Sequence, residues 1–265
     1  MEKKISNIKL FLFDMDGTLY LGNRLYDFTP ELLATIKESG GKYMFMTNNS
    51  SKSVVDYIKK LDNLGIKACY DDFITSSQAT AYYLKKHHSD AVLYVCGTKS
   101  LKDELIREGF RVTENIDEVT CIVMGFDTEL TFKKLEDICK MLLTRELPYI
   151  ATNPDVVCPT EFGSVPDCGS VSEMIYNATG KRPLFIGKPS PLMPELAMEK
   201  TGYQKDNTAV IGDRIYTDVK SGLNAGVLSI LVMSGETTKE ILEASYDKPD
   251  LVLSDASEII KALKG

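Results

Sequence analysis

Short apolar runs alternate with amphipathic segments along almost the whole chain. In its first part, apolar runs at Ile8–Phe13 and Tyr43–Thr47 flank a segment with helical periodicity at Thr29–Ser39. Runs that are almost entirely apolar are typical of strands in a parallel sheet that helices cover on both faces. The alternation of such strands with helices predicts an α/β fold built on a doubly wound parallel sheet.

The same alternation of strands and helices continues up to about residue 88 and again in the last third of the chain. We expect strands of the same sheet at Phe73–Thr75, Leu184–Ile186, Thr208–Ile211, Ser229–Met233 and Asp250–Leu253. We expect helices at about Ser51–Leu64, at Gln78–Lys86, from near Pro191, at about Tyr216–Asn224 and at the C-terminal end.

A second segment with its own alternation of strands and helices lies between these blocks. We expect strands at Ala91–Cys96, Thr120–Phe126 and Pro148–Thr152, helices at Ser100–Glu108, Phe132–Arg145 and Ser170–Thr179, and a Gly/Pro-rich loop at Pro159–Gly169. A segment of about 90 residues is long enough for a core of its own. We therefore predict a main domain of residues 1–88 and 183–265 and an inserted α/β domain of residues 89–182.

Composition and charge restrict the class of protein. The 265 residues are 43% hydrophobic and 26% charged, which is ordinary for a globular protein. A net charge of −7 without a Lys/Arg cluster argues against nucleic-acid binding, and no apolar segment approaches the length of a membrane span. The first strand follows Met1 too closely for a signal peptide, so we expect a cytoplasmic protein. The cysteines lack Cys-x-x-Cys spacing and the only histidines are the adjacent His87 and His88, which argues against a zinc site.

Two carboxylates directly follow the first predicted strand, in the sequence Asp14-Met15-Asp16-Gly17-Thr18. Alternate side chains of an extended chain point to the same side, and open α/β sheets bind ligands beyond the carboxyl ends of their strands. Two carboxylates so close repel each other, so either they share a cation or one of them holds a proton. Both states are useful in catalysis.

Further polar residues follow three other predicted strands, namely Thr47-Asn48-Asn49, Lys188, and Asp213 with Asp218. Phosphoryl transfer through an aspartyl phosphate needs an anionic nucleophile, a proton donor, hydrogen-bond donors for the phosphoryl oxygens, and cations. We predict Asp14 as the nucleophile and Asp16 as the general acid that protonates the leaving alkoxide and then activates water. The Thr47 hydroxyl and the Asn48 amide are the predicted donors to the phosphoryl group.

The remaining residues of this set supply or bind positive charge. Lys188 is predicted to neutralise the phosphoryl group and to keep Asp14 ionised, because a cation within about 4–6 Å lowers a carboxylate pKa. Asp213 offers a hard oxygen ligand of the kind that Mg²⁺ prefers. Asp218 either binds the metal through water or orients Lys188.

Taken in order, the motifs Asp14-Met15-Asp16-Gly17-Thr18, Thr47-Asn48-Asn49, Gly187-Lys188-Pro189 and Gly212-Asp213-Arg214 with Asp218 resemble those of the haloacid dehalogenase (HAD) superfamily. The first two motifs are too close together for a cap domain, whereas the second and third enclose the inserted segment. This arrangement resembles the type IIA branch, the NagD-like or p-nitrophenylphosphatase group. The sequence Thr152-Asn153-Pro154-Asp155 is also characteristic of that group.

The resemblance implies a Rossmann-like core, an α/β cap that sets substrate specificity, and Mg²⁺-dependent phosphatase activity. It implies that the Asp14 carboxylate, the Asp16 main-chain carbonyl and Asp213 bind Mg²⁺, and that Thr47-Asn48-Asn49 and Lys188 contact the phosphate. The cap segment Asn153–Gly169 would face the substrate, with Asp155 either a substrate contact or an Asx-turn residue.

Three functions remain open at this point. The first is hydrolysis of small phosphorylated metabolites such as sugar, nucleotide, glycolate or pyridoxal phosphates, and Asp16 favours it because an alkoxide leaving group needs a proton. The alternatives are a phosphotransferase or phosphomutase and a non-enzymatic phosphoacceptor module. The sequence leaves the oligomeric state open, and a homodimer through the cap, in which a cap strand such as Thr120–Phe126 pairs across the interface, is one option.

Overall fold

The computed structural model describes residues 2–160 and 162–265 of the chain. Position 1, and position 161 in the segment Asn153–Gly169, lie outside the described residues. Two parallel sheets, two antiparallel hairpins and helices make up the described part, which confirms the predicted α/β class. None of the described helices has both the length and the apolar character that crossing a lipid bilayer requires.

The chain divides into two compact units, and each of them combines segments that are distant in sequence. Unit 1 contains the residues up to Thr47 together with Ile58–Ile74 and Lys188–Gly265. Unit 2 contains Asn48–Tyr57 and Thr75–Gly187. Unit 2 therefore includes the predicted inserted segment and also the residues that directly follow Thr47.

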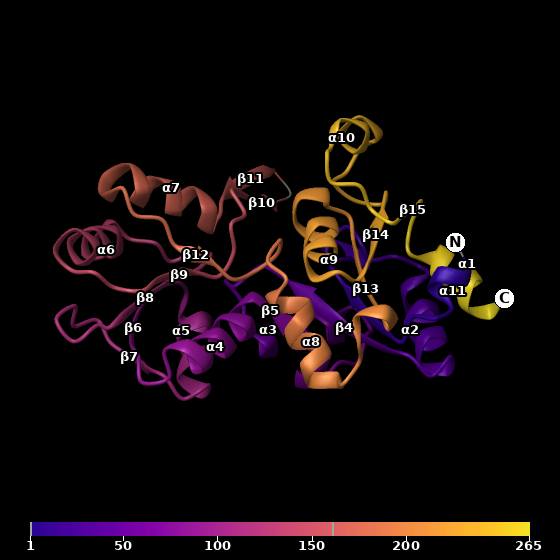
Figure 1. Cartoon of the computed structure of the whole chain (residues 1–265), viewed down its shortest axis with the longest axis horizontal. Coiled ribbons are helices and arrows are strands. Elements are labelled where there is room, and N and C mark those ends of the chain that lie inside the picture. The colour runs from indigo at the N-terminus through magenta and orange to yellow at the C-terminus, as the bar shows by residue number, and fades with distance from the viewer. Residues whose placement is uncertain (1, 161) are drawn as a thin grey trace. The chain divides into compact units, whose positions relative to one another are not determined.

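Unit 1 is organised around a six-stranded sheet in the order β15-β14-β13-β1-β4-β5 (Figure 1). The strands are β1 (Leu10–Phe13), β4 (Lys42–Thr47), β5 (Phe73–Thr75), β13 (Thr208–Gly212), β14 (Leu228–Val232) and β15 (Leu251–Leu253). All four residues of β1 are buried, as its apolar run predicts, and β1 pairs in parallel with β13 and β4. The chain order reverses between β1 and β13, which is the point where open α/β sheets bind their ligands.

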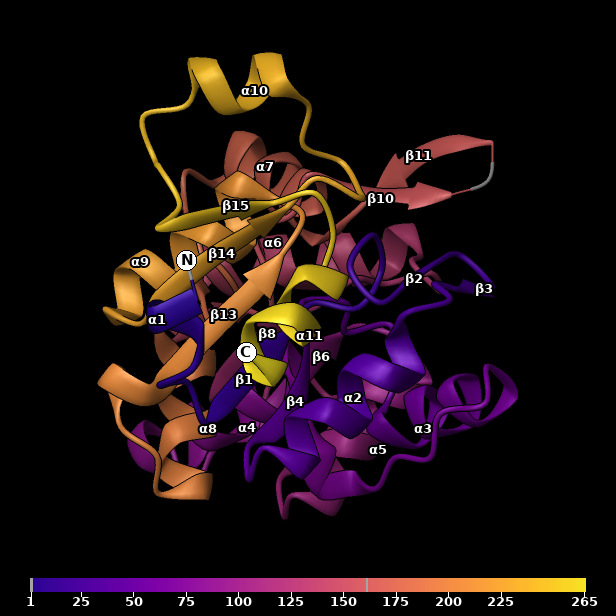
Figure 2. The same cartoon turned by 90° about the vertical axis from the view of Figure 1, so that its right-hand side faces the viewer.

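Helices cover both faces of this sheet, with α8 and α9 on one side and α2 and α11 on the other (Figure 2). The helices that contain residues of unit 1 are α1 (Glu2–Ile5), α2 (Thr29–Glu38), α3 (Val54–Asn63), α8 (Leu192–Thr201), α9 (Lys220–Ala225), α10 (Lys239–Ala244) and α11 (Ser257–Lys264). A two-stranded hairpin of β2 (Tyr20–Leu21) and β3 (Arg24–Leu25) follows β1 and was not predicted, because its strands are too short to produce a pattern.

Unit 2 contains a five-stranded parallel sheet in the order β12-β9-β8-β6-β7. Its strands are β6 (Val92–Cys96), β7 (Arg111–Val112), β8 (Cys121–Met124), β9 (Tyr149–Ala151) and β12 (Leu184–Phe185). Helices α4 (Ser76–His87) and α5 (Lys99–Arg107) lie on one face, and α6 (Phe132–Thr144) and α7 (Cys168–Thr179) lie on the other (Figure 1).

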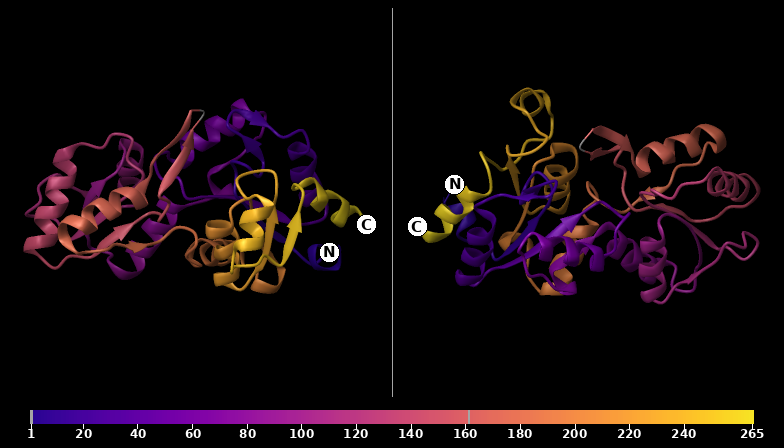
Figure 3. Two further views of the ribbon diagram at one scale, coloured as in Figure 1. Left: turned by 90° about the horizontal axis from the view of Figure 1, so that it is seen from above. Right: turned by 180° about the vertical axis from the view of Figure 1, so that it is seen from behind.

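Three predictions about elements are wrong. The segment predicted as a loop at Pro159–Gly169 contains most of an antiparallel hairpin of β10 (Val157–Thr160) and β11 (Gly163–Pro166), which lies beside α7 (Figure 3). Gly163 adopts a φ of +137°, and this left-handed backbone lets the chain reverse where proline and glycine had suggested irregular structure.

The other two corrections concern which strands pair. Strand β12 was predicted in the main sheet, but it pairs with β9 in the sheet of unit 2. Strand β8 was offered as one strand for pairing across a dimer, but β6 and β9 occupy its two edges. A strand with both edges paired has no free backbone groups for a second subunit.

The core of unit 2 also buries a carboxyl group that the catalytic prediction does not use. Glu104 on α5 is fully buried, and neither of its carboxylate oxygens has a hydrogen-bond partner among the described residues. Burial raises the pKa of Glu104 to about 7, and the nearby Arg107 opposes this only in part. Burying a charge without a partner is costly, so the folded protein favours the protonated form.

We expect Glu104→Gln to make the stability of unit 2 less dependent on pH. Folding raises the pKa of this carboxyl group from its ordinary value of 4.5 to about 7. The group therefore destabilises the folded state increasingly as the pH rises through this range. The variant removes this ionisation, so its free energy of unfolding should exceed that of the wild type by about 2–3 kcal/mol at pH 8 and by much less at pH 5. Urea unfolding at the two pH values measures this, and an equal difference at both would contradict the assignment.

Candidate active site

The first predicted carboxylates follow β1 at the centre of the unit 1 sheet. The backbone amide of Asp14 donates to the Ile211 carbonyl of β13 at 2.8 Å, which continues the strand pairing up to this residue. Gly17 then turns the chain with a φ of +82°, and a Cβ atom at this position would lie 2.5 Å from Asp213 Oδ2. Only glycine fits here, so the first motif and the residue after β13 are in close contact.

Lys188 is the buried cation of the site. Its side chain is 3% exposed, and Nζ donates to Asp14 Oδ1 at 2.6 Å and to Asp218 Oδ1 at 2.6 Å. The Met46 carbonyl, at the end of β4, accepts a further hydrogen bond from Nζ at 3.3 Å. Lys188 therefore connects the carboxyl ends of β1 and β4 with the segment after β13. The strand that precedes Lys188 in the sequence, β12, belongs to the sheet of unit 2.

Asp213 and Asp218 follow β13 and complete a cluster of carboxylates. Oxygens of Asp14, Asp213 and Asp218 all lie within 4.8 Å of one another. The π-helical turn Ile215–Val219 contains Asp218, whose Oδ2 accepts from the Arg214 backbone amide at 3.1 Å. Such turns occur frequently at functional sites, and here the turn directs Asp218 back towards Lys188.

The charges in this cluster do not balance. Burial and the neighbouring Asp14 and Asp218 carboxylates raise the pKa of Asp213. Burial also raises the pKa of Asp218, although the Lys188 ammonium opposes it. For Lys188, burial lowers the pKa, but the carboxylates of Asp14 and Asp218 outweigh this effect and the net direction is upward. The cluster therefore holds more negative charge than its lysine neutralises.

The donor set fits a hard divalent cation. Asp213 Oδ2 accepts from the Glu236 backbone amide at 2.7 Å, whereas Oδ1 is buried without a hydrogen-bond partner among the described residues. A desolvated carboxylate oxygen beside two other carboxylates is costly unless a cation binds it. Mg²⁺ prefers carboxylate oxygens of this kind.

Asp16 is placed differently from Asp14. It is exposed, and its Oδ1 accepts from the Gly22 backbone amide in the β2–β3 hairpin at 3.3 Å. Its carboxylate is not part of the cluster formed by Asp14, Asp213 and Asp218. Of the two alternatives for the carboxylates after β1, a cation shared through both side chains gains no support from this cluster. The metal contact that the family resemblance implies for Asp16 is through its main-chain carbonyl.

The residues predicted after β4 are divided between the two units. Thr47, at the end of β4, is buried and belongs to unit 1, whereas Asn48 and Asn49 belong to unit 2. Asn49 Oδ1 accepts from the Ser51 backbone amide and hydroxyl at 3.0 Å and 2.7 Å. Asn48 Nδ2 donates to Asp155 Oδ2 at 2.7 Å. The structure thus brings Asn48 and Asp155 together, and their contacts with a phosphate remain predictions.

Sequence reasoning missed an ion pair next to the carboxylate cluster. Arg214 Nε lies 2.8 Å from Glu236 Oε2, and the Tyr216 hydroxyl donates to Glu236 Oε1 at 3.1 Å. These contacts hold the segment whose amide binds Asp213. Arg214 directly follows Asp213 in the fourth motif, so its position near the site could be expected from the sequence. Nothing in the sequence around Glu236 indicates that Glu236 lies near the site.

The sequence of the chain is similar to those of known hydrolases. Residues 11–111 match the family described as haloacid dehalogenase-like hydrolase, and residues 185–259 match a second family described as HAD-hydrolase-like. The acid sugar phosphatase of Staphylococcus saprophyticus is 32% identical over 98% of this chain and 100% of its own length. The 5'-nucleotidase YutF of Bacillus subtilis is 32% identical over 95% of this chain and 97% of its own length.

The fold is also similar to that of a solved phosphatase. The crystal structure of 4-nitrophenylphosphatase from Thermotoga maritima is 41% identical, covers 98% of both chains and superposes with a TM-score of 0.93. These matches confirm the resemblance inferred from the four motifs. The chain therefore belongs to the haloacid dehalogenase-like hydrolases, and it is an enzyme of their phosphatase class.

Proposed function

We propose that the chain is a Mg²⁺-dependent phosphatase that hydrolyses small phosphorylated metabolites through an aspartyl phosphate on Asp14. The observation that carries this proposal is the pair of 2.6 Å contacts from Lys188 Nζ to Asp14 and Asp218. The Asp14 carboxylate lies beside a buried ammonium, which fits a nucleophile that attacks phosphorus next to a stabilising positive charge. The relatives named for sugar phosphates and for 5'-nucleotides favour sugar or nucleotide phosphates as substrates.

Each further step is assigned to a residue of the chain. Asp14 attacks the phosphorus atom while the Lys188 ammonium stabilises the charge on the phosphoryl oxygens. The Thr47 hydroxyl, with the Asn48 and Asn49 side chains, supplies hydrogen bonds to those oxygens. Asp16 protonates the leaving alkoxide and then removes a proton from the water that attacks the aspartyl phosphate. The exposed position of Asp16 suits an exchange of protons with substrate and solvent.

Asp14, Asp213 and the main-chain carbonyl of Asp16 would hold the Mg²⁺ ion. When bound, the ion neutralises the carboxylates and the substrate phosphate. The unpartnered Asp213 Oδ1 supports this assignment. Asp218 takes the role of orienting Lys188, since its Oδ1 accepts from Nζ.

We also propose that residues 1–88 and 183–265 form the catalytic domain and that residues 89–182 form the cap that sets substrate specificity. Four of the five strands of the unit 2 sheet lie within residues 89–182, which supports an independent domain there, whereas β12 and α4 of unit 2 lie just outside these bounds. The oligomeric state stays open, and a homodimer through the cap would have to form without the pairing of β8.

Removal of the metal is expected to abolish activity reversibly. After dialysis against EDTA, hydrolysis of p-nitrophenyl phosphate should fall by at least about 100-fold, because the carboxylate cluster would repel the substrate phosphate. Addition of Mg²⁺ should restore the rate and raise the melting temperature. As a control, the inactive metal-free protein should keep its circular dichroism spectrum, which shows that it is still folded. Full activity in EDTA would contradict the metal assignment.

Product analysis separates hydrolysis from phosphoryl transfer. With a hexose phosphate as substrate and an excess of a different free hexose as acceptor, we expect inorganic phosphate to form in a one-to-one ratio with the hexose released. Phosphate recovered on the acceptor in place of inorganic phosphate would show a phosphotransferase, and an isomeric hexose phosphate would show a phosphomutase.

A further inference from the structure

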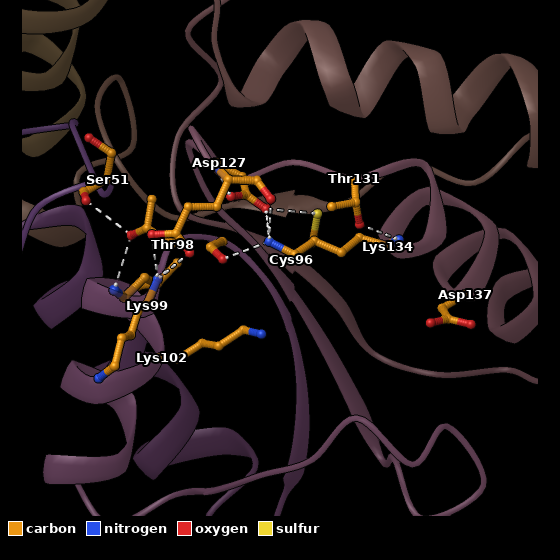
Figure 4. Close-up of polar contacts among 12 residues, drawn as sticks. Ser51, Cys96, Thr98, Lys99, Lys102, Asp127, Thr131, Lys134 and Asp137 are labelled. Carbon is orange, nitrogen blue, oxygen red and sulfur yellow. Dashed lines mark hydrogen bonds and ion pairs between the residues drawn. The ribbon is translucent and has the colours of Figure 1, made fainter.

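The loop that follows Thr47 is bound by the carboxyl edge of the unit 2 sheet. The Ser50 hydroxyl lies 2.8 Å from Thr152 Oγ1, just after β9, and accepts from the Phe126 backbone amide, after β8, at 2.9 Å. The Ser51 carbonyl accepts from Thr98 Oγ1, after β6, at 3.0 Å (Figure 4). Three loops at the strand ends of this sheet therefore hold the backbone and side chains next to Asn48.

The side chain of Asn48 is bound by Asp155, from the motif Thr152-Asn153-Pro154-Asp155. Asn48 Nδ2 donates to Asp155 Oδ2 at 2.7 Å, and Asn153 Nδ2 donates to the same oxygen at 2.9 Å. Asn48 is 8% exposed, Asp155 is 5% exposed and Asn153 is fully buried. Hydrogen bonds from amides to a buried carboxylate are among the stronger ones in proteins.

The backbone of Asp155 is itself closely packed. Its carbonyl accepts from the Gly169 backbone amide at 2.8 Å, and a Cβ atom at position 169 would lie 2.2 Å from the Pro154 carbonyl oxygen. No larger residue fits at Gly169. The start of α7 thus fixes Asp155, and Asp155 in turn fixes the side chain of Asn48.

We propose that Asp155 is a positioning residue that sets the orientation of the Asn48 carboxamide. The terminal torsion of an asparagine is soft and roughly two-fold, so without a fixed acceptor the carboxamide exchanges the directions of its NH₂ group and its oxygen. In one orientation of the carboxamide, its NH₂ group donates to the phosphoryl oxygens. In the other orientation, the carboxamide oxygen faces these oxygens and repels them. This inference rests on the proposed function, in which Asn48 donates to the phosphoryl group.

Direct contact between Asp155 and the substrate phosphate explains these observations less well. The Asp155 carboxylate is buried, its Oδ2 accepts from two amides, and a negative charge repels a phosphate. An Asx turn needs a backbone amide that donates to the carboxylate, whereas the hydrogen bonds to Asp155 Oδ2 come from the side-chain amides of Asn153 and Asn48, the latter distant in sequence. A residue of the motif Thr152-Asn153-Pro154-Asp155 in the inserted segment therefore positions Asn48 of the second catalytic motif.

A double-mutant cycle between Asn48 and Asp155 tests the proposal. The measurements are kcat and KM for p-nitrophenyl phosphate and the inhibition constant of inorganic phosphate, for Asn48→Ala, Asp155→Ala and the double variant. Loss of a hydrogen bond to the charged phosphoryl group should raise the inhibition constant by about 10-fold in Asn48→Ala and by a similar factor in Asp155→Ala. If Asp155 acts through Asn48, the double variant is no worse than Asn48→Ala.

Two further variants separate positioning from charge and from stability. Asp155→Asn keeps an acceptor oxygen for Asn48 and should bind phosphate within about threefold of the wild type. Asp137→Ala removes another carboxylate of unit 2 with the same 5% exposure, bonded to Tyr94 and Lys133, and should leave the inhibition constant unchanged. If Asp155→Ala does not fold, Asp155→Leu replaces it in the cycle, because it fills the volume and has no acceptor.

The outcomes distinguish this inference from the proposed function. The positioning role of Asp155 would be overturned if the two single substitutions raised the inhibition constant independently, so that their factors multiplied in the double variant. It would also be overturned if Asp155→Asn impaired phosphate binding as much as Asp155→Ala. In both cases the contact of Asn48 with phosphate would still stand. An Asn48→Ala variant with unchanged phosphate inhibition would overturn the contact of Asn48 with phosphate and the inference together. Neither result affects the role of Asp14, which is tested separately.

Discussion

Replacement of Asp14 by Asn is expected to reduce kcat for p-nitrophenyl phosphate by at least about 1,000-fold, because a neutral amide cannot form the aspartyl phosphate. The substitution keeps the size of the side chain and a hydrogen-bond acceptor for Lys188 Nζ, which lies 2.6 Å from Asp14 Oδ1 in the wild type. The folded structure should therefore persist. Steady-state kinetics with the purified variant, together with its melting temperature, measure both effects.

The control for this experiment is an aspartate of the same unit outside the site. Asp206, in the turn before β13, is exposed, and Asp206→Asn should retain wild-type kinetics. Turnover by Asp14→Asn at a rate near that of the control would exclude Asp14 as the nucleophile.

Replacement of Lys188 by Met is expected to impair both catalysis and folding. Without the ammonium, the charge on the phosphoryl oxygens loses a buried cationic partner, and we expect kcat/KM to fall by about 100- to 1,000-fold. Removing one partner of a buried ion pair also leaves charges uncompensated, which costs about 3–5 kcal/mol. Here Asp218, with a side chain 1% exposed, loses its ammonium partner.

The destabilisation by Lys188→Met should depend on pH. Burial already raises the pKa of Asp218, and loss of Lys188 removes the group that opposes this rise. A carboxyl group with a raised pKa in the folded state destabilises the protein increasingly as the pH rises through that range. In EDTA, we therefore expect a large loss of unfolding free energy at pH 8 and a smaller loss at pH 5. Lys239→Met, on the exposed start of α10, is the matched control.

The carboxyl ends of β1 and β13 could be predicted from the sequence for a simple reason. Strand β1 is buried throughout, so its apolar run has no polar interruption, and the run stops where Asp14 begins. The same holds for β13 before Asp213. Because parallel strands of one sheet end at the same edge, the convergence of Asp14 and Asp213 follows from these two runs.

Pairing between distant segments could not be predicted in the same way. Strand β12 has only two residues, and its partner β9 is chosen by packing within unit 2, which periodicity does not encode. The bond between Asn48 and Asp155 joins residues far apart in the chain. Each side chain alone suggests a turn or a ligand contact, and only the fold shows that they bind each other.

The central claim is that Asp14 carries the phosphoryl group during turnover. In a rapid-quench experiment with ³²P-labelled substrate, we expect acid-stable label on the wild-type protein that hydroxylamine releases, as acyl phosphates require. Reduction of the quenched protein with borohydride should yield homoserine in place of Asp14, detected by mass spectrometry of the peptide that contains it. Burst kinetics without covalent label, or label on any other residue, would contradict the account.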